Sequence, residues 1–215
     1  MLLQRAEELP QGGSWLYELK LDGFRAEAIK SAGRVHLRSR NDKDFNTKYP
    51  AIIQALPAMP DETVIDGEIV DLDELGRPSF SALQNHGSGA ASVVYYAFDV
   101  MILAGQDVMN EPLSMRRRLL RGVLAKVGEP IRESIVLEAS LPELIASVKA
   151  HGLEGLVAKR SDSRYEPGQR SGAWQKMRVN RGQASTSASQ TRPHHQPADR
   201  RLPVPLPLRL RRISR

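Results

Sequence analysis

The chain has 215 residues, a formal net charge of +6 at pH 7 and no cysteine. Disulfides, thiolate zinc sites and cysteine nucleophiles are therefore excluded, and the length allows one or two domains with a full hydrophobic core. Neither end carries an apolar run long enough to span a bilayer, and no signal peptide is evident, so the sequence predicts a cytoplasmic protein without membrane contact.

The positive charge is concentrated at the C-terminal end. Residues 181–215 hold eight arginines and a single acid, Asp199, which gives them a net charge of +7 and leaves −1 for residues 1–180. Nucleic-acid contact in residues 1–180 would therefore need a local patch. Prolines interrupt any helix or strand period after residue 180, so we predict a folded domain over 1–180 and a Pro/Arg-rich disordered tail over 181–215.

Periodicity predicts more strands than helices. Alternating or apolar-rich runs indicate strands over 15–21, 34–39, 63–71, 92–103, 153–160 and 173–179. Helical spacing indicates helices over 47–56 and 114–127, and a capping box at Ser140–Glu143 opens a third helix that Gly152 ends. The apolar faces of the first two helices are Tyr49, Ile52, Ile53 and Leu56, and Met115, Leu119, Leu120, Val123 and Val127. Short connections between strands favour an α+β domain built on antiparallel sheets.

The strand over 15–21 leads into a K-x-D-G tetrapeptide that begins at Lys20. Alternation places Glu18, Lys20 and Asp22 on one face of this strand and apolar residues on the other. A lysine is a nucleophile only as the neutral amine, which two flanking carboxylates disfavour unless a bound cation balances them. The pattern therefore indicates a metal-nucleotide substrate. A surface lysine at a strand-to-turn junction would have the same sequence pattern.

Carboxylates and an aromatic ring occur in two further predicted strands. Asp66 and Glu68 share a face of a run that is otherwise apolar. Buried, they would need a cation, a ribose hydroxyl or backbone donors; on an edge strand they would be solvated. Phe98, in the strand over 92–103, is suited either to stacking on a purine or to core packing.

Cations accompany the last two predicted strands. Glu154 and Lys159 are five residues apart, so both can face one ligand only if Glu154 precedes its strand or a bulge intervenes. Lys176 and Arg178 share a face of the strand that follows the loop containing Arg170. This arrangement suits a phosphate, and a solvated edge almost as well.

Taken in chain order, these segments resemble the nucleotidyltransferase motif series of ATP-dependent DNA ligases, especially bacterial ones of the end-joining kind. The six matching segments are KLDG at Lys20, SRN at Ser39, DGEIV at Asp66, YYAFD at Tyr95, EGLVAKR at Glu154 and WQKMR at Trp174. The resemblance covers about residues 1–180. It implies an α+β, antiparallel-sheet nucleotidyltransferase domain of an ATP-grasp-like class.

The resemblance also implies a reaction and a role for each site residue. Lys20 would attack the α-phosphorus of ATP and hold AMP, which then passes to a 5′-phosphate at a DNA nick and is displaced by the 3′-hydroxyl. Glu18 would lie at the adenine edge and Phe98 on the ring. Glu68 would reach the ribose or a metal, and Glu154 would hold Mg²⁺ or Mn²⁺. The cations implied around the phosphates are Arg25, Arg40, Lys159, Arg170 and Lys176.

Two features depart from the family pattern. Arg178 stands where lysine is usual, which preserves charge but changes hydrogen-bond geometry. Ligases of this type continue into an OB-fold domain, yet only 35 residues follow Asn180, and a Pro/Arg-rich tail of that length cannot form a five-stranded barrel. We therefore expect a frameshift or a truncated gene, with residues 181–215 out of frame and nick sealing impaired.

The resemblance implies nicked or broken double-stranded DNA as substrate, end-joining proteins as partners and a monomeric enzyme. Two alternatives remain open from the sequence. In the first, the chain is a relic that binds ATP or nicked DNA without sealing it. In the second, it is a nucleotidyltransferase of the RNA-ligase or capping kind, which uses a similar lysine.

Overall fold

The computed structural model describes residues 1–79, 83–84 and 93–180. A compact unit covers Met1–Gly182. The tail predicted over 181–215 lies outside the described residues. Among the described helices, none has the length and apolar character needed to cross a membrane.

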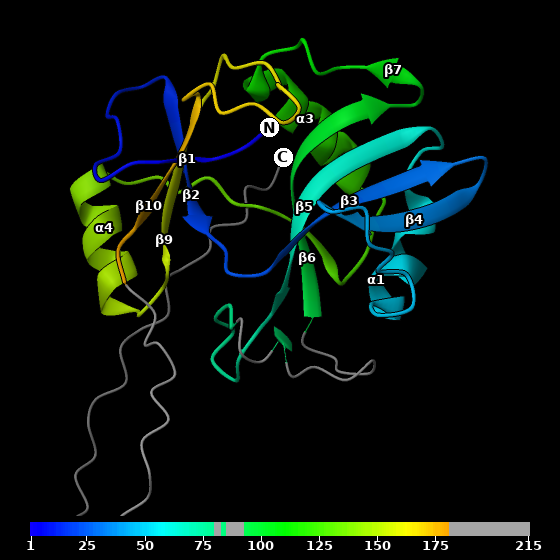
Figure 1. Ribbon diagram of the computed structural model, residues 1–215, viewed down its shortest axis with the longest axis horizontal. Helices are drawn as coiled ribbons and strands as arrows, with labels where there is room; N and C mark the ends of the chain where they lie inside the picture. The colour runs from blue at the N-terminus through cyan, green and yellow to red at the C-terminus, as the bar shows by residue number, and fades with distance from the viewer. Residues whose placement is uncertain (80–82, 85–92, 181–215) are drawn as a thin grey trace, which may run out of the picture. The chain divides into compact units, whose positions relative to one another are not determined.

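The smaller of two sheets carries the K-x-D-G strand at one edge (Figure 1). Its strand order is β1 (Gln4–Arg5), β10 (Trp174–Arg178), β9 (Gly155–Arg160) and β2 (Trp15–Lys20). β9 pairs antiparallel with both β2 and β10, whereas the short β1 runs parallel to β10. Helix α4 (Leu141–Ala150) packs against this sheet, and Glu143 accepts a hydrogen bond from the Ser140 backbone N–H, so the predicted capping box is confirmed.

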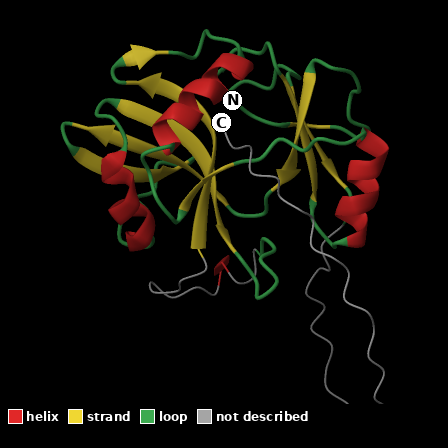
Figure 2. Ribbon diagram, turned by 180° about the vertical axis from the view of Figure 1, so that it is seen from behind, coloured by secondary structure: helices red, strands yellow, loops and turns green. Residues whose placement is uncertain are grey.

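The larger sheet provides the opposite half of the unit (Figure 2). Its order is β4 (Arg34–Ser39), β3 (Phe24–Ser31), β5 (Thr63–Asp71), β6 (Val93–Leu103) and β7 (Gln106–Asp107), with β8 (Ile131–Glu133) parallel to β6. Helices α1 (Pro50–Ala55), η1 (Leu56–Ala58) and α3 (Leu113–Leu124) supply the residues that bury one face of this sheet. Both sheets are mostly antiparallel, which confirms the predicted α+β class.

Strand β3 was not among the predicted strands. Its sequence is rich in alanine, which has a low strand propensity, but Ala26 and Ala28 are fully buried between β4 and β5. The hydroxyl of Tyr95 donates to the Ala26 carbonyl at 2.9 Å. Tertiary pairing on both sides, rather than local preference, therefore makes this segment a strand.

Helix α3 buries charge as well as apolar surface. Leu120 and Val123 are buried as predicted, but Arg116 and Arg117 are buried too, which the apolar-face prediction had not included. Arg116 forms a bidentate ion pair with Asp99 of β6, with both N–O distances at 2.8 Å. Two arginines on the inner face of α3 thus reach toward the space between the sheets.

Aromatic and sulfur-containing side chains join the two sheets. One buried cluster includes Met101 of β6, Leu113 of α3, Trp174 of β10 and Tyr165 from the loop between β9 and β10. Phe98 packs against it, with its ring edge-on to Trp174 at a centroid distance of 6.0 Å. This cluster fixes the walls of the cavity described next.

Candidate active site

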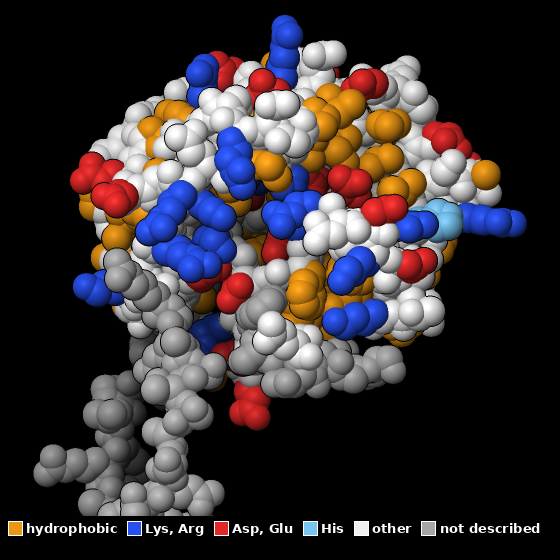
Figure 3. Space-filling model, viewed as in Figure 1, with side chains coloured by type: hydrophobic (Ala, Val, Ile, Leu, Met, Phe, Trp, Pro, Cys, Tyr) orange, Lys and Arg blue, Asp and Glu red, His pale blue; other side chains and the backbone are white. Residues whose placement is uncertain are grey.

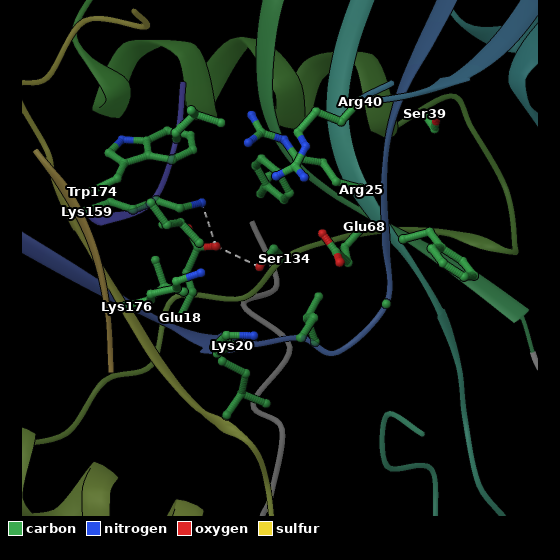
Figure 4. Close-up of a pocket in the computed structure, with 18 of the residues that line it drawn as sticks. Glu18, Lys20, Arg25, Ser39, Arg40, Glu68, Ser134, Lys159, Trp174 and Lys176 are labelled. Atoms are coloured by element: carbon green, nitrogen blue, oxygen red, sulfur yellow. Dashed lines mark hydrogen bonds and ion pairs between the residues drawn. The ribbon is translucent and has the colours of Figure 1, made fainter. Parts of the chain in front are cut away.

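A cavity of about 350 Å³ opens between the two sheets. Figure 3 shows Lys and Arg side chains gathered around a hollow in this face of the molecule, and Figure 4 shows the side chains inside it. The cavity lining includes nine of the predicted site residues, which come from widely separated parts of the sequence: Glu18, Lys20, Arg25, Arg40, Glu68, Phe98, Lys159, Arg170 and Lys176. Residues far apart in the chain are therefore brought to one place, while their individual roles stay predictions.

Lys20 stands at the end of β2 and is held by a carboxylate. Its Nζ lies 2.5 Å from Oε2 of Glu154, and Nε of Arg178 lies 3.0 Å from the other oxygen of that carboxylate. Glu154 directly precedes β9, as one of the two predicted arrangements required. Glu154 does not itself line the cavity, but it contacts Lys20, which does.

The glycines of the two motifs allow the backbones to approach closely. A Cβ atom at Gly23 would lie 2.1 Å from the Ile69 carbonyl oxygen of β5. A Cβ at Gly155 would lie 2.0 Å from the Met177 carbonyl oxygen of β10. Any larger residue would push the strands apart, so these glycines bring Lys20 and Glu154 to their positions.

Glu18 is buried and held by three donors. Arg117 Nη1 donates to Oε1 at 2.6 Å, while Ser134 Oγ and Lys159 Nζ donate to Oε2 at 2.8 and 2.9 Å. The expectation that a bound cation balances both carboxylates of the K-x-D-G strand is wrong for Glu18, because two cations of the chain itself already do so. Asp22 lies beyond the end of β2.

The ammonium of Lys159 lies between two aromatic rings. Its Nζ is 4.4 Å from the ring centroids of both Phe98 and Trp174, within the range of cation–π attraction. Burial lowers the pKa of Lys159, and the carboxylate of Glu18 opposes that shift. Lys159 thus faces Glu18 in this structure, and its predicted contact with a phosphate stays a prediction.

Arg25 is largely occupied by protein partners. Its guanidinium binds Asp66 through Nε at 3.0 Å and Nη2 at 2.5 Å, and also donates to the Met1 carbonyl and the Tyr165 hydroxyl. Asp66 is fully buried and does not line the cavity. Arg25 therefore has little remaining hydrogen-bonding capacity for a phosphate.

Glu68, predicted to reach the ribose or a metal, lies in a largely buried position at the cavity. Burial raises its pKa to about 8, with Lys20 opposing the shift. No described residue donates a hydrogen bond to its carboxylate, which points into the cavity across from Glu18 and Lys159 (Figure 4). Within residues 1–79, 83–84 and 93–180, no three acidic or histidine side chains form a metal cluster, so the metal contacts predicted for Glu68 and Glu154 stay predictions.

Three contributors were missed from the sequence: Arg117, Ser134 and the ring of Trp174. The signal for Arg117 was present, because three consecutive arginines begin inside the helix predicted over 114–127. An arginine of such a helix needs an anionic partner only if it is buried, and the local pattern does not show which of the three is buried. Ser134 carries no comparable signal.

Comparison with known proteins decides the family. Residues 2–178 match the family described as ATP dependent DNA ligase domain. The chain belongs to the ATP-dependent DNA ligase family. It is 37% identical over 191 residues to the multifunctional non-homologous end joining protein LigD of Pseudomonas aeruginosa, covering 86% of this chain and 22% of that protein. It is 30% identical over 183 residues to the SPbeta prophage-derived DNA ligase-like protein LigB of Bacillus subtilis, covering 82% and 66%.

Solved structures agree with this assignment. A mycobacterial DNA ligase D complexed with ATP and MES has 35% identity and a TM-score of 0.67, over 76% of this chain and 54% of that one. Chlorella virus DNA ligase-adenylate, at 20% identity and a TM-score of 0.57, shares the fold. The chain spans about a fifth of the LigD proteins it matches. The predicted ligase-type adenylation domain, related to end-joining ligases, is confirmed.

Proposed function

We propose that this domain adenylylates itself on Lys20 with ATP as donor. The amine attacks the α-phosphorus, a P–N bond forms, the P–O bond to the β-phosphate breaks, and pyrophosphate leaves. The observation that carries this proposal is the convergence of nine predicted side chains from both sheets on one cavity, with Lys20 among them. We also propose that the domain is of the ATP-grasp-like class that the resemblance implies.

The proton on Lys20 must leave before attack. Glu154 Oε2, at 2.5 Å from Nζ, is the acceptor that the geometry offers, and Arg178 beside Glu154 holds that carboxylate in place. Lys176 contributes positive charge on the same side, and its own pKa is lowered by burial and by Lys20.

The remaining lining residues provide binding and charge compensation. We assign Glu18 to the adenine edge and Phe98 to the base, with Trp174 supporting Phe98. Arg40, Arg170 and Lys176 would compensate the negative charge that develops on the phosphates, which is the main source of acceleration in such transfers. A divalent ion near Glu68 and Glu154 would supply further Lewis-acid stabilisation to the phosphates.

The later steps are proposed on the strength of family membership. AMP would pass from Lys20 to the 5′-phosphate of a DNA nick, and the 3′-hydroxyl would displace it in break repair with end-joining partners. We place residues 1–180 in this adenylation domain, acting as a monomer in the cytoplasm. Residues 1–180 have a net charge of −1 and little to hold duplex phosphates with, so we expect sealing to be much weaker than self-adenylylation.

A labelled nicked duplex tests these steps separately. ATP-started sealing requires every step, whereas a duplex supplied with AMP already on its 5′-phosphate requires only the last. We expect weak, salt-sensitive sealing from both substrates, limited by DNA affinity. Multiple-turnover sealing at physiological salt would contradict the predicted impairment. Adduct formation on Lys20 with no AMP transfer to DNA would instead favour the non-sealing relic, and transfer restricted to RNA ends would favour the RNA-ligase alternative.

A further inference from the structure

Arg117, on the inner face of α3, connects the two sheets through one guanidinium. Its Nη1 donates to Oε1 of Glu18 in β2 at 2.6 Å. Its Nη2 donates to Glu133 Oε1 at 3.0 Å and to the Ser134 carbonyl at 2.6 Å, at the end of β8. The side chains of Arg117 and Glu18 are both buried. Arg117 therefore fixes the position of Glu18 relative to the larger sheet.

The carboxylate of Glu18 has almost no hydrogen-bonding capacity left. An ionised carboxylate offers about four lone-pair sites, and three are taken, by Arg117 at Oε1 and by Ser134 and Lys159 at Oε2. The fourth site is on Oε1, next to the bond from Arg117. Because an ionised carboxylate only accepts hydrogen bonds, any base edge placed there must donate one.

Purines differ in whether the group at position 6 donates or accepts a hydrogen bond. The amino group of adenine donates a hydrogen bond, whereas the oxo group of guanine or hypoxanthine accepts one. Glu18 lines the cavity and is labelled beside Ser134 and Lys159 in Figure 4. An oxo group facing the remaining lone pair of Glu18 would leave both acceptors unsatisfied in a buried site, which is how polar sites reject analogues.

We propose that Arg117 is the positioning residue for purine selection, holding Glu18 as an acceptor-only contact that admits 6-amino purines and rejects 6-oxo purines. The inference rests on the proposed function, because it places the base against Glu18. Arg117 is not among the residues that line the cavity, so it acts through Glu18 and not on the nucleotide.

The same helix offers a matched control. Arg121 also pairs with Glu133, through Nε at 3.0 Å and Nη2 at 3.1 Å, but from an exposed position and with no contact to Glu18. Replacing Arg121 therefore removes a guanidinium from Glu133 while leaving Glu18 unchanged. Lys159 is unsuitable as a test position, because it lines the cavity and contacts two aromatic rings.

The test compares ATP with inosine triphosphate, which carries the 6-oxo group. Affinity for each is measured by isothermal titration, and the adduct on Lys20 by intact mass over a series of nucleotide concentrations. We expect Arg117→Met to reduce the preference for ATP by about tenfold to a hundredfold, the effect of one hydrogen bond to a charged group. Half-saturating ATP should rise more than the maximal rate falls. Arg117→Lys should recover part of the preference, and Arg121→Met should keep all of it.

The outcomes separate this inference from the proposed function. Equal binding of the two nucleotides by the wild type, or an undiminished preference in folded Arg117→Met, would overturn the inference. If circular dichroism shows Arg117→Met to be unfolded, Arg117→Lys and Arg117→Gln replace it, and each must lower the preference. Failure of the wild type to form an adduct would contradict the proposed function, while the ratio of affinities would still test Arg117.

Discussion

Nζ of Lys20 and Oε2 of Glu154 lie 2.5 Å apart although 134 residues separate them in the chain. The pairing follows from the register of β2 and β9, in which Lys20 lies opposite Gly155. Glu154 therefore meets the amine because it directly precedes the strand that pairs with β2. Changes at Glu154 should alter the chemistry at Lys20 without disturbing the sheets.

Glu154→Gln should slow adduct formation on Lys20 by about a hundredfold, because it removes the acceptor nearest to the lysine proton and a candidate metal ligand. Glu68→Gln should slow it by a similar factor and raise the Mg²⁺ concentration needed for half-maximal rate. The measurement is the rate of AMP attachment over a range of Mg²⁺ concentrations.

Asp73→Asn serves as the control for both carboxylates. Asp73 lies in a turn, where it pairs with Arg77 and lines none of the cavity. It should leave the rate and the Mg²⁺ dependence unchanged. Equal losses in all three variants, with normal circular dichroism, would show that the carboxylates at the cavity have no special role.

The raised pKa of Glu68 predicts the direction of a pH effect on stability. Between about pH 4.5 and 8, Glu68 is protonated in the folded protein and ionised in the unfolded chain. Unfolding then releases a proton, so the contribution of Glu68 to stability decreases as pH rises across that window. Without metal, the melting temperature of the wild type should fall relative to that of Glu68→Gln as pH rises. A difference independent of pH would contradict burial of this carboxyl.

The Arg116–Asp99 pair predicts a large but partly recoverable loss of stability. Both side chains are fully buried, and Arg116 also donates to the carbonyls of Glu111 and Ser163. Arg116→Met should lower the free energy of unfolding by about 3 to 5 kcal/mol, because Asp99 is left as an uncompensated buried charge. Adding Asp99→Leu should recover part of the loss, as followed by urea denaturation. A double variant no more stable than the single one would argue against charge burial as the cause.

Much of the fold was predictable because its strands follow simple alternation. The predicted strands over 34–39 and 63–71 coincide with β4 and β5. β3 was missed because its two alanines give no strand signal; they are buried by pairing with strands that come later in the chain. Local strand propensities give no information on such long-range pairing.

The site was predictable as a set of motifs but not as a network of contacts. Sequence motifs indicated Glu18 and Lys159, yet they did not show that these two residues pair with each other. Arg117 was missed because a helix pattern marks apolar positions, whereas this arginine is buried by an anion on a distant strand. Contacts of this kind depend on how the two sheets meet.

The central claim is that Lys20 becomes covalently bound to AMP. Incubation with ATP and Mg²⁺, followed by intact mass and peptide mapping, measures this directly. The wild type should gain the mass of one AMP on the peptide that contains Lys20, and Lys20→Arg and Lys20→Ala should gain nothing. An adduct that persists in Lys20→Ala or maps to another lysine would contradict the account, as would a folded wild-type protein that binds ATP and forms no adduct.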